Sequence, residues 1–200
     1  MSEKIDLYKL HKDEYVAPKK PTLVKTRKAQ YLSVDGGGRG GDEGFQEDLA
    51  ALYAVAYTLK MTSKKEGRDY GVSKLEGLWD AQDAKHDWTQ GPPELWNWTL
   101  MIRTPDFIGK RALAAGLATL EAKGKKPTRT VELRSLSEGK CVQILHVGPY
   151  DAEAPTIAKL QEFMAAEGLS PNGLHHEIYL SDPRRVEPER LRTILRHPVK

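Results

Sequence analysis

The sequence His175-His176-Glu177-Ile178-Tyr179-Leu180 lies near the C-terminus and has the two-residue period of a β-strand. At that period, His175, Glu177 and Tyr179 share one face of the strand. The alternate residues share the other face and are mostly typical of a core. The first face presents an imidazole, a carboxylate and a phenol together. Because a carboxylate on a central strand is costly unless a group pairs with it or water reaches it, Glu177 marks a candidate functional site.

The predicted elements follow the same order twice along the chain. In residues 29–103 the pattern predicts a strand at 31–35, a helix from about residue 43, and strands at 70–79 and 95–103. In residues 140–198 it predicts a strand at 141–147, a helix at 153–167, and strands at 174–180 and 191–198. Repetition of strand, helix, strand, strand indicates an internal duplication.

The remaining segments flank or join these two modules. Residues 104–139 supply a connecting helix at 107–123 and a strand at 130–136, whereas residues 1–22 are charged and look like an N-terminal arm. The polar segment 83–93 connects the last two strands of the first module. We therefore expect one α+β domain over residues 1–200, in which helices pack on an antiparallel sheet.

The overall composition of the chain excludes several classes of function. Hydrophobic residues make up 39% and charged residues 30% of the 200 positions, and no apolar run approaches the ~20 residues of a membrane span. The N-terminus lacks the apolar core of a signal peptide, and Cys141 is the only cysteine, so we expect a cytoplasmic protein without a disulfide. The net charge of +3 is dispersed, which argues against nucleic acid as a partner.

Several motifs favour structural interpretations. Gly36-x-Gly38-x-x-Gly41 matches a dinucleotide fingerprint, but the acidic residues that follow disfavour phosphate, so a flexible turn is expected. His175-x-Glu177 lacks a third ligand at a suitable spacing, so neither a metal nor a cofactor is expected. Cys141 fits a buried structural thiol. The arginines from Arg184 to Arg196 alternate with acidic residues and predict a solvated, salt-bridged surface.

Aromatic residues gather on strands that should be neighbours. Trp79, Trp96 and Trp98 lie there, and Glu76 has the place in the first module that Glu177 has in the second. Any single tryptophan is more often core than ligand wall. Aromatic walls with one or two carboxylates, however, form sites for flat, apolar or cationic molecules. Tyr53, one helical turn from Tyr57, either lines such a pocket or caps the core.

These segments together resemble the GyrI-like small-molecule-binding family. The resemblance rests on His175–Arg185 with Leu191–Arg196, on Leu75–Trp79, on Trp96–Arg103, and on Gly148-Pro149-Tyr150. It covers nearly the whole chain from about residue 4, without a DNA-binding helix-turn-helix domain. The family's SOUL-like fold has two strand–helix–strand–strand modules related by a pseudo-twofold axis, with a ligand cleft between them.

The resemblance also implies an activity. The chain is most similar to a branch that includes hydrolases of the cyclopropane in DNA-alkylating natural products, which hold their substrate in an aromatic cage. Residues available for binding here are Trp79, Trp96, Trp98, Tyr150, His175, Glu76 and Tyr53. The resemblance places Glu177 in the ligand cleft. For such a reaction we expect Glu177 to be the base, and Tyr179 or, as an alternative, His175 to donate to the developing oxyanion. Asp80 departs from the branch, where another aromatic commonly follows the residue matching Trp79.

Two other functions remain open at this stage. One is a non-catalytic multidrug-binding sink or sensor in which Glu177 pairs with a ligand cation. The other is an interaction protein that acts on a macromolecule such as gyrase through its surface. The recurrence of aromatic and acidic residues on internal strands favours a planar aromatic or cationic small molecule.

Overall fold

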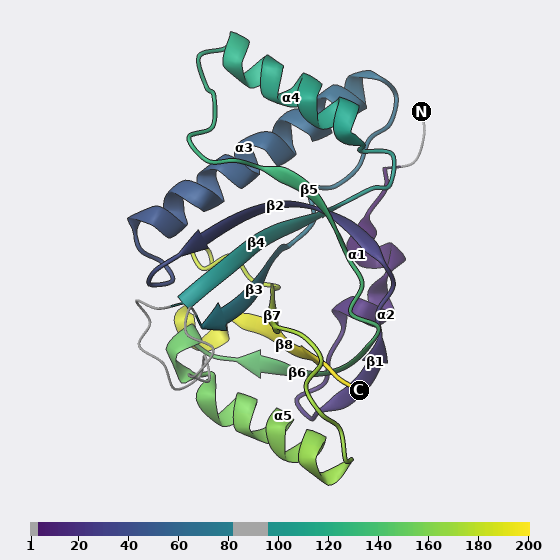
Figure 1. The fold of residues 1–200 in the computed structure, drawn as a ribbon, viewed down its shortest axis with the longest axis vertical. Helices are drawn as coiled ribbons and strands as arrows, with labels where there is room; N and C mark the ends of the chain where they lie inside the picture. The colour runs from purple at the N-terminus through teal and green to yellow at the C-terminus, as the bar shows by residue number, and fades with distance from the viewer. Residues whose placement is uncertain (1–3, 82–95) are drawn as a thin grey trace.

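A single antiparallel sheet organises the chain. The computed structural model describes residues 4–81 and 96–200, and its eight strands are arranged in the order β1-β6-β8-β7-β3-β4-β2-β5 (Figure 1). The strands are β1 Thr22–Lys25, β2 Ala29–Gly37, β3 Leu75–Ala81, β4 Trp96–Thr104, β5 Glu132–Leu136, β6 Lys140–Val147, β7 His175–Tyr179 and β8 Arg192–Pro198. The helices are α1 Leu7–Leu10, α2 Lys12–Tyr15, α3 Glu43–Lys65, α4 Lys110–Ala122 and α5 Ala154–Ala166, with short 3-10 turns at Tyr150–Ala152 and Pro188–Arg190.

The predicted duplication is visible in the strand order. The first module is β2-α3-β3-β4 and the second is β6-α5-β7-β8. Within the sheet, β6-β8-β7 on one side mirrors β3-β4-β2 on the other, and the two modules meet where β3 pairs with β7. The predicted α+β fold class, with an antiparallel sheet and helices packed on it, is confirmed.

The two edge strands link the modules more closely than the sequence suggested. β1 precedes the first module in the chain but pairs with β6 of the second. β5 precedes the second module but pairs with β2 of the first. β1 therefore crosses from the N-terminal side of the first module to the edge of the second, whereas β5, which lies between the modules in sequence, extends the first. The N-terminal arm contains α1 and α2, and β1 begins where the predicted arm ends.

Helices α3, α4 and α5 all pack on one face of the sheet, called here the helix-covered face (Figure 1). α3 begins where Asp42 accepts a hydrogen bond from the Phe45 amide at 2.8 Å, and its apolar stripe packs on Leu32 and Leu100. α4 lies close to α3, since a Cβ at Gly116 would stand 2.8 Å from Leu59. The burial of these stripes fixes both helices on the sheet. No helix within residues 4–81 and 96–200 has the length and apolarity to cross a bilayer.

Two predicted boundaries shift, each for a local reason. β3 begins at Leu75 instead of residue 70, because Tyr70 forms an isolated bridge with Ile5 of the arm. α4 begins at Lys110 instead of residue 107, because Gly109 is its N-cap and the preceding turn is closed by the Ile108 amide on Pro105. The predicted connection 83–93 lies outside the described residues.

The opposite face of the sheet carries a buried polar network under the N-terminal arm, and we call it the arm-covered face. His176 lies at its centre: Nε2 is 3.0 Å from Glu76 Oε2, and Nδ1 is 3.0 Å from Glu138 Oε1. Arg196 Nη1 donates to Glu138 Oε2 at 3.2 Å. Because β3 supplies Glu76 and β7 supplies His176, this contact joins the two modules at their seam. Arg196 is 2% exposed, so its predicted place on a solvated surface is wrong.

The arm completes this network. Glu14 of α2 accepts a hydrogen bond from Arg103 at 2.9 Å, and the Tyr15 hydroxyl donates to Glu76 at 2.7 Å. The buried members of the network are equal in number, with the carboxyl groups of Glu14, Glu76 and Glu138 against the basic groups of Arg103, His176 and Arg196. The half-exposed Arg27 adds a further contact to Glu14 at 2.6 Å. Matched and hydrogen-bonded charges are the condition under which ionic groups tolerate burial.

The two flanking carboxylates change the protonation of His176. Burial opposes its charge, but Glu138 and Glu76 outweigh that effect and raise the pKa of His176 to about 9. In the same contacts, His176 and Arg196 hold the pKa of Glu138 at about 2 against the opposing effect of burial. His176 is therefore a charged imidazolium at neutral pH, and its charge is part of the folded structure.

We predict that His176→Gln lowers the free energy of unfolding by about 3 kcal/mol at pH 6, because it leaves Glu76 and Glu138 without their shared cation. The raised pKa means that this stabilisation is fully present below the unfolded value of 6.5 and is lost as the pH rises through about 9. Urea unfolding of wild type and variant between pH 6 and pH 10 measures the difference. Lys159→Gln, at an exposed position of α5, is the control; a constant difference between wild type and His176→Gln across this range would contradict the assignment.

Candidate functional site

Glu177 lies at the centre of the helix-covered face, where the two modules meet. In register it stands opposite Gly77 of β3 on one side and Leu195 of β8 on the other. His175 Nε2 lies 3.4 Å from Glu177 Oε1, as the two-residue period predicted. Glu177 is 7% exposed and His175 is 1% exposed. The carboxylate is thus almost removed from water on a central strand.

A second carboxyl group joins this pair from α5. Glu153 is the N-cap residue of α5, and one of its oxygens lies within 4.8 Å of ligand atoms of both His175 and Glu177. Glu153 is 6% exposed. The sequence placed it at the first position of a predicted helix but gave no sign that this end of the helix reaches β7. We call Glu153, His175 and Glu177 the carboxyl cluster.

The electrostatics of the carboxyl cluster differ from those of the arm-covered face. Within residues 4–81 and 96–200, no lysine or arginine forms an ion pair with Glu153 or Glu177. Burial first, and then the negative charge of Glu177, raise the pKa of Glu153 well above its usual range. Glu153 therefore holds a proton at neutral pH.

The cluster contains the donor types of a metal site. One imidazole and two carboxyl groups are a set that binds divalent transition metals with further positions open. Glu153 supplies the third donor that the His175-x-Glu177 pattern lacked. A metal bound to this set would require both carboxyl groups to be ionised, so it would displace the proton of Glu153.

Tyr179 extends the cluster toward the aromatic residues. Its hydroxyl accepts a hydrogen bond from Trp79 Nε1 at 3.0 Å, and its ring meets that of Tyr150 edge-on at 5.7 Å. Burial, followed by the charge of Glu177 and a hydrogen bond to it, raises the pKa of Tyr179 well above its usual value. Gly77 leaves room for this contact, because a Cβ there would lie 3.0 Å from Trp79 Nε1 and 3.2 Å from the Tyr179 hydroxyl. Tyr179 is thus a protonated donor next to Glu177.

The predicted aromatic residues lie together, but most of their ring surface is buried against other side chains. The Trp79 ring lies 5.8 Å from Trp96 and 6.0 Å from Trp98, and Phe45 stacks on Trp79 at 6.1 Å. Trp98 is 2% exposed, and its Nε1 donates to Asp48 at 2.9 Å. Trp79, at 7% exposed, connects this wall to Tyr179. Tyr150 is the exposed member of the aromatic set, at 40%.

The predicted site residues Glu76 and Tyr53 make their hydrogen bonds and ring contact with groups other than the carboxyl cluster and Tyr179. Glu76 is 0% exposed on the arm-covered face, bound to Tyr15 and His176. The expectation that it mirrors Glu177 is wrong, because Gly77 stands opposite Glu177 and a shift of one residue moves a side chain to the other face. Tyr53 of α3 packs against the first core and stacks with Tyr57 at 6.0 Å. Cys141 is fully buried and its pKa is raised to about 12, chiefly by burial, as expected of a structural thiol.

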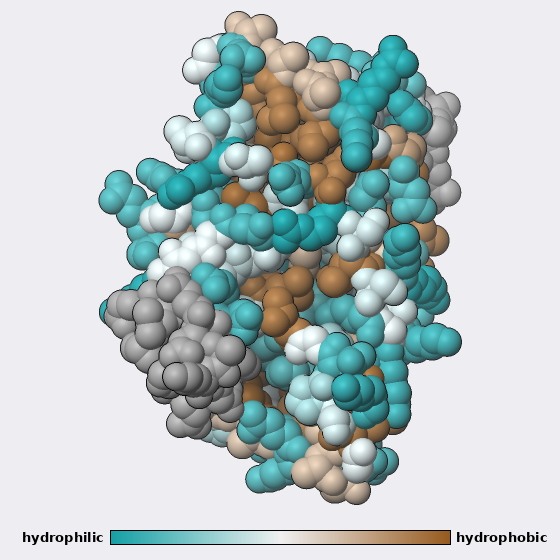
Figure 2. All heavy atoms as spheres, viewed as in Figure 1, coloured by the Kyte–Doolittle hydropathy of each residue, from teal (hydrophilic) through white to brown (hydrophobic). Residues whose placement is uncertain are grey.

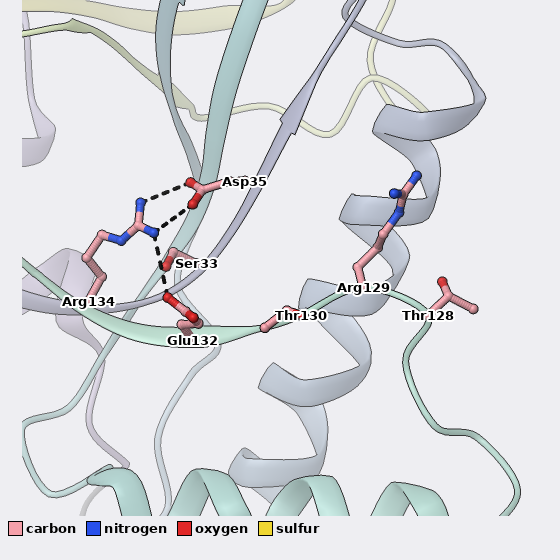
Figure 3. A pocket seen from close by; sticks show the side chains of 7 residues that line it. All are labelled: Ser33, Asp35, Thr128, Arg129, Thr130, Glu132 and Arg134. Carbon is pink, nitrogen blue, oxygen red and sulfur yellow. Dashed lines mark hydrogen bonds and ion pairs between the residues drawn. The ribbon is translucent and has the colours of Figure 1, made fainter.

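Two pockets of the described residues lie elsewhere. One of about 330 Å³ lies beside β5, where Arg134 already pairs with Asp35 at 2.7 Å and with Glu132 at 3.8 Å (Figure 3). The other, of about 580 Å³, lies between the arm at residues 4–9 and residues 71–74. The face in Figure 2 shows an apolar area over the α3–α4 end amid hydrophilic surroundings. None of these features includes the carboxyl cluster.

Comparison with known proteins agrees with this fold. Residues 47–200 match the model of the GyrI-like small molecule binding domain, and the chain belongs to that family. A search of curated protein sequences gives no significant match.

Three solved structures illustrate the range of relatives. An uncharacterized conserved protein from Listeria innocua is 38% identical, with 98% of this chain and 100% of that chain covered and a TM-score of 0.90. A hydrolase from Listeria innocua is also 38% identical, with 99% and 100% covered and a TM-score of 0.88. The C-terminal domain of EcmrR, at 10% identity, 90% and 97% coverage and a TM-score of 0.58, shares the fold alone.

We predict that Glu153→Gln raises the free energy of unfolding by about 3 kcal/mol at pH 7, since folding no longer requires a glutamate to be protonated about 2.5 pH units above its unfolded pKa. Because burial raises the pKa of Glu153 in the folded protein, wild type loses stability only above the unfolded pKa of this group. The gain in unfolding free energy of Glu153→Gln should therefore disappear below about pH 4.5. Thermal unfolding of both proteins between pH 4 and pH 8 measures this. Glu162→Gln, on the same helix, is the control, and an equal Tm of wild type and Glu153→Gln at pH 7 would contradict a neutral Glu153.

Proposed function

We propose that the protein binds planar aromatic small molecules beside the carboxyl cluster and hydrolyses activated cyclopropanes of DNA-alkylating cyclopropanoid compounds. The observation that carries this proposal is a nearly buried carboxylate, Glu177, with no arginine or lysine ion pair within the described chain and with a tyrosine donor beside it. Membership of the GyrI-like family supports small-molecule binding. Two structures from Listeria innocua at 37–38% identity are described as hydrolases, which supports a hydrolytic reaction.

The reaction makes modest demands on the protein. In a cyclopropane conjugated to a dienone, water attacks the CH2 carbon, one ring bond breaks, and its electron pair moves into the ring system to give a phenolate. Relief of ring strain and aromatisation drive the step. The site therefore has to bind a flat molecule, orient and deprotonate water, and stabilise an oxyanion.

The residues of the site fit these tasks. Glu177 accepts the proton of the attacking water. Tyr179, held by Trp79, donates to the developing oxyanion, and Tyr150 presents an exposed ring on which a planar ligand stacks. His175 lies 3.4 Å from Glu177 and orients its carboxylate. No triad is required, because the substrate itself is the strained electrophile.

We predict that the purified protein converts a cyclopropanoid to its ring-opened alcohol well above the buffer rate, and that Glu177→Gln lowers kcat at least 100-fold by removing the base. Chromatography of the product measures both rates. Glu187→Gln, at the exposed residue that precedes the 3-10 turn Pro188–Arg190, should match wild type. The absence of product with wild type, or equal rates for wild type and Glu177→Gln, would contradict the catalytic assignment.

A second candidate function is binding of organic cations without catalysis. Two carboxyl groups without a lysine or arginine ion pair in the described chain favour it, since an aromatic, acidic site attracts a delocalised cation. In this case a planar cation such as ethidium binds in the micromolar range and Glu177→Gln weakens it at least tenfold, about 1.4 kcal/mol. Fluorescence titration tests this. Binding that Glu177→Gln leaves unchanged would remove this candidate.

A further inference from the structure

The carboxyl cluster brings three metal-binding donors together from two separate elements. His175 and Glu177 lie on one face of β7, and Glu153 reaches them from the start of α5. One donor atom of each residue lies within 4.8 Å of the other two. The three residues are 6%, 1% and 7% exposed in chain order, and the packing of α5 on the sheet fixes their relative positions.

The spacing of the donors fits coordination of a single ion. His175 Nε2 lies 3.4 Å from Glu177 Oε1, which is longer than the ~2.7–3.2 Å of an N–H···O hydrogen bond. Two ligands at ~2.0–2.1 Å from one tetrahedral zinc ion lie about 3.3 Å apart, so this pair has the separation of two ligands that share an ion. The terminal torsion of a glutamate is broad, and a rotation of the Glu153 carboxyl group brings a third donor to the same ion.

Two oxygen atoms on this face are buried without a hydrogen bond in the part of the chain that the structure describes. They are Glu153 Oε1 and Thr193 Oγ1 of β8, and the Thr193 hydroxyl lies close to Glu153. Thr193 is 0% exposed and stands opposite Tyr179 of β7 in register. A buried oxygen without a partner is costly, and such atoms are typical of sites that bind an ion or a ligand. A metal ion gives Glu153 Oε1 a partner, and Thr193 is available to hydrogen-bond a further ligand of that ion.

The charges around the cluster favour an external cation. Within residues 4–81 and 96–200, no lysine or arginine forms an ion pair with Glu153 or Glu177. On the arm-covered face, by contrast, the buried carboxyl groups pair with arginine or with His176. The positive end of α5 opposes a cation near Glu153, but two carboxylates in direct contact with an ion attract it more strongly than a helix terminus repels it.

The donor types select the class of metal. An imidazole nitrogen combined with carboxylate oxygens suits zinc and its first-row transition-metal neighbours. Calcium and magnesium instead take roughly six to eight oxygen ligands. We propose that Glu153, His175 and Glu177 bind one divalent transition-metal ion, represented here by zinc, with further coordination positions open to water. The site rests on its own geometry and does not require the hydrolysis proposed above.

A bound ion would also regulate that hydrolysis, and this consequence alone rests on the proposed function. The electron pair that Glu177 gives to the metal is not available to accept a proton from the attacking water. Zinc should therefore inhibit ring opening, and a chelator should restore it. The same three residues would then act as a metal site in one state and contain the base in the other.

Binding of zinc to the chelator-treated protein tests the site without any substrate. By calorimetry wild type should bind one zinc ion per chain, and excess zinc should raise its Tm. Glu153→Gln and Glu177→Gln keep the shape of the side chain but lose a charged donor, so each should weaken zinc binding at least tenfold. Glu162→Gln, at an exposed position of α5, should bind zinc as wild type does. Magnesium at the same concentration should give neither heat nor a shift in Tm.

Cobalt(II) in place of zinc gives a spectroscopic readout of the same site. Bound to one imidazole and two carboxylates with a low coordination number, it should show visible absorption bands that are stronger than those of the hydrated ion. Zinc should displace these bands, and Glu153→Gln should lose them although it remains folded. The Tm of each variant without metal shows whether it folds.

Three results would overturn the metal site. The first is a wild-type protein that binds no zinc. The second is zinc binding of equal strength to wild type, Glu153→Gln and Glu177→Gln, which would place the ion on other residues. The third is magnesium binding as strong as that of zinc.

The metal site and the hydrolysis fail in different experiments. If wild type binds zinc, the two glutamine variants bind it weakly, and metal-free wild type forms no ring-opened product, the hydrolysis fails and the metal site stands. If zinc accelerates ring opening, the metal site stands and Glu177 is not the base.

Discussion

The contact between His176 and Glu76 is the interaction on which the rest of the structure depends. It joins β7 of one module to β3 of the other at the seam, and it does so on a face from which water is excluded. Arg196 of the second module and Glu138 of the connecting segment continue the network, and the arm brings further partners to it from the N-terminus. The duplicated modules therefore meet through balanced buried charge as well as through strand pairing. Loss of one member leaves its partners buried without compensation, which is more costly than loss of a surface pair.

The same two strands present opposite electrostatic conditions on their two faces. On the arm-covered face every buried carboxyl group has a basic partner, and the pKa of Glu138 is lowered. On the helix-covered face the carboxyl groups of Glu153 and Glu177 face each other, and the pKa of Glu153 is raised. On the helix-covered face neither carboxyl group has a lysine or arginine partner within the described residues, and His175 alone faces Glu177 at 3.4 Å. Buried carboxyl groups without such partners reduce stability, and they are enriched at functional sites.

Local sequence patterns predicted those features of the fold that depend on residues close together in the chain. The two-residue period grouped His175, Glu177 and Tyr179 correctly, and the order of elements revealed the duplication. The sequence does not predict contacts that form only in the folded chain. It predicts Glu153 only as the first residue of a helix and Arg196 as a surface residue, whereas both side chains are buried. No sequence period indicates that α5 begins beside β7 or that the arm covers the opposite face. The error on Glu76 has the same origin, because strand register depends on pairing that a single strand does not encode.

The register at the seam explains why Glu177 of the second module has no carboxylate counterpart in the first. Contacts across the seam join residues one hundred positions apart, Glu76 with His176 and Trp79 with Tyr179, and Gly77 stands opposite Glu177. The pseudo-twofold axis therefore passes beside Gly77 and Glu177, where the two modules share a single space. A glutamate at both positions would place two carboxylates against each other across the axis. Glycine in the first module leaves that space to one carboxylate and to the rings beside it, and α5 of the second module then brings the carboxyl group of Glu153 close to Glu177.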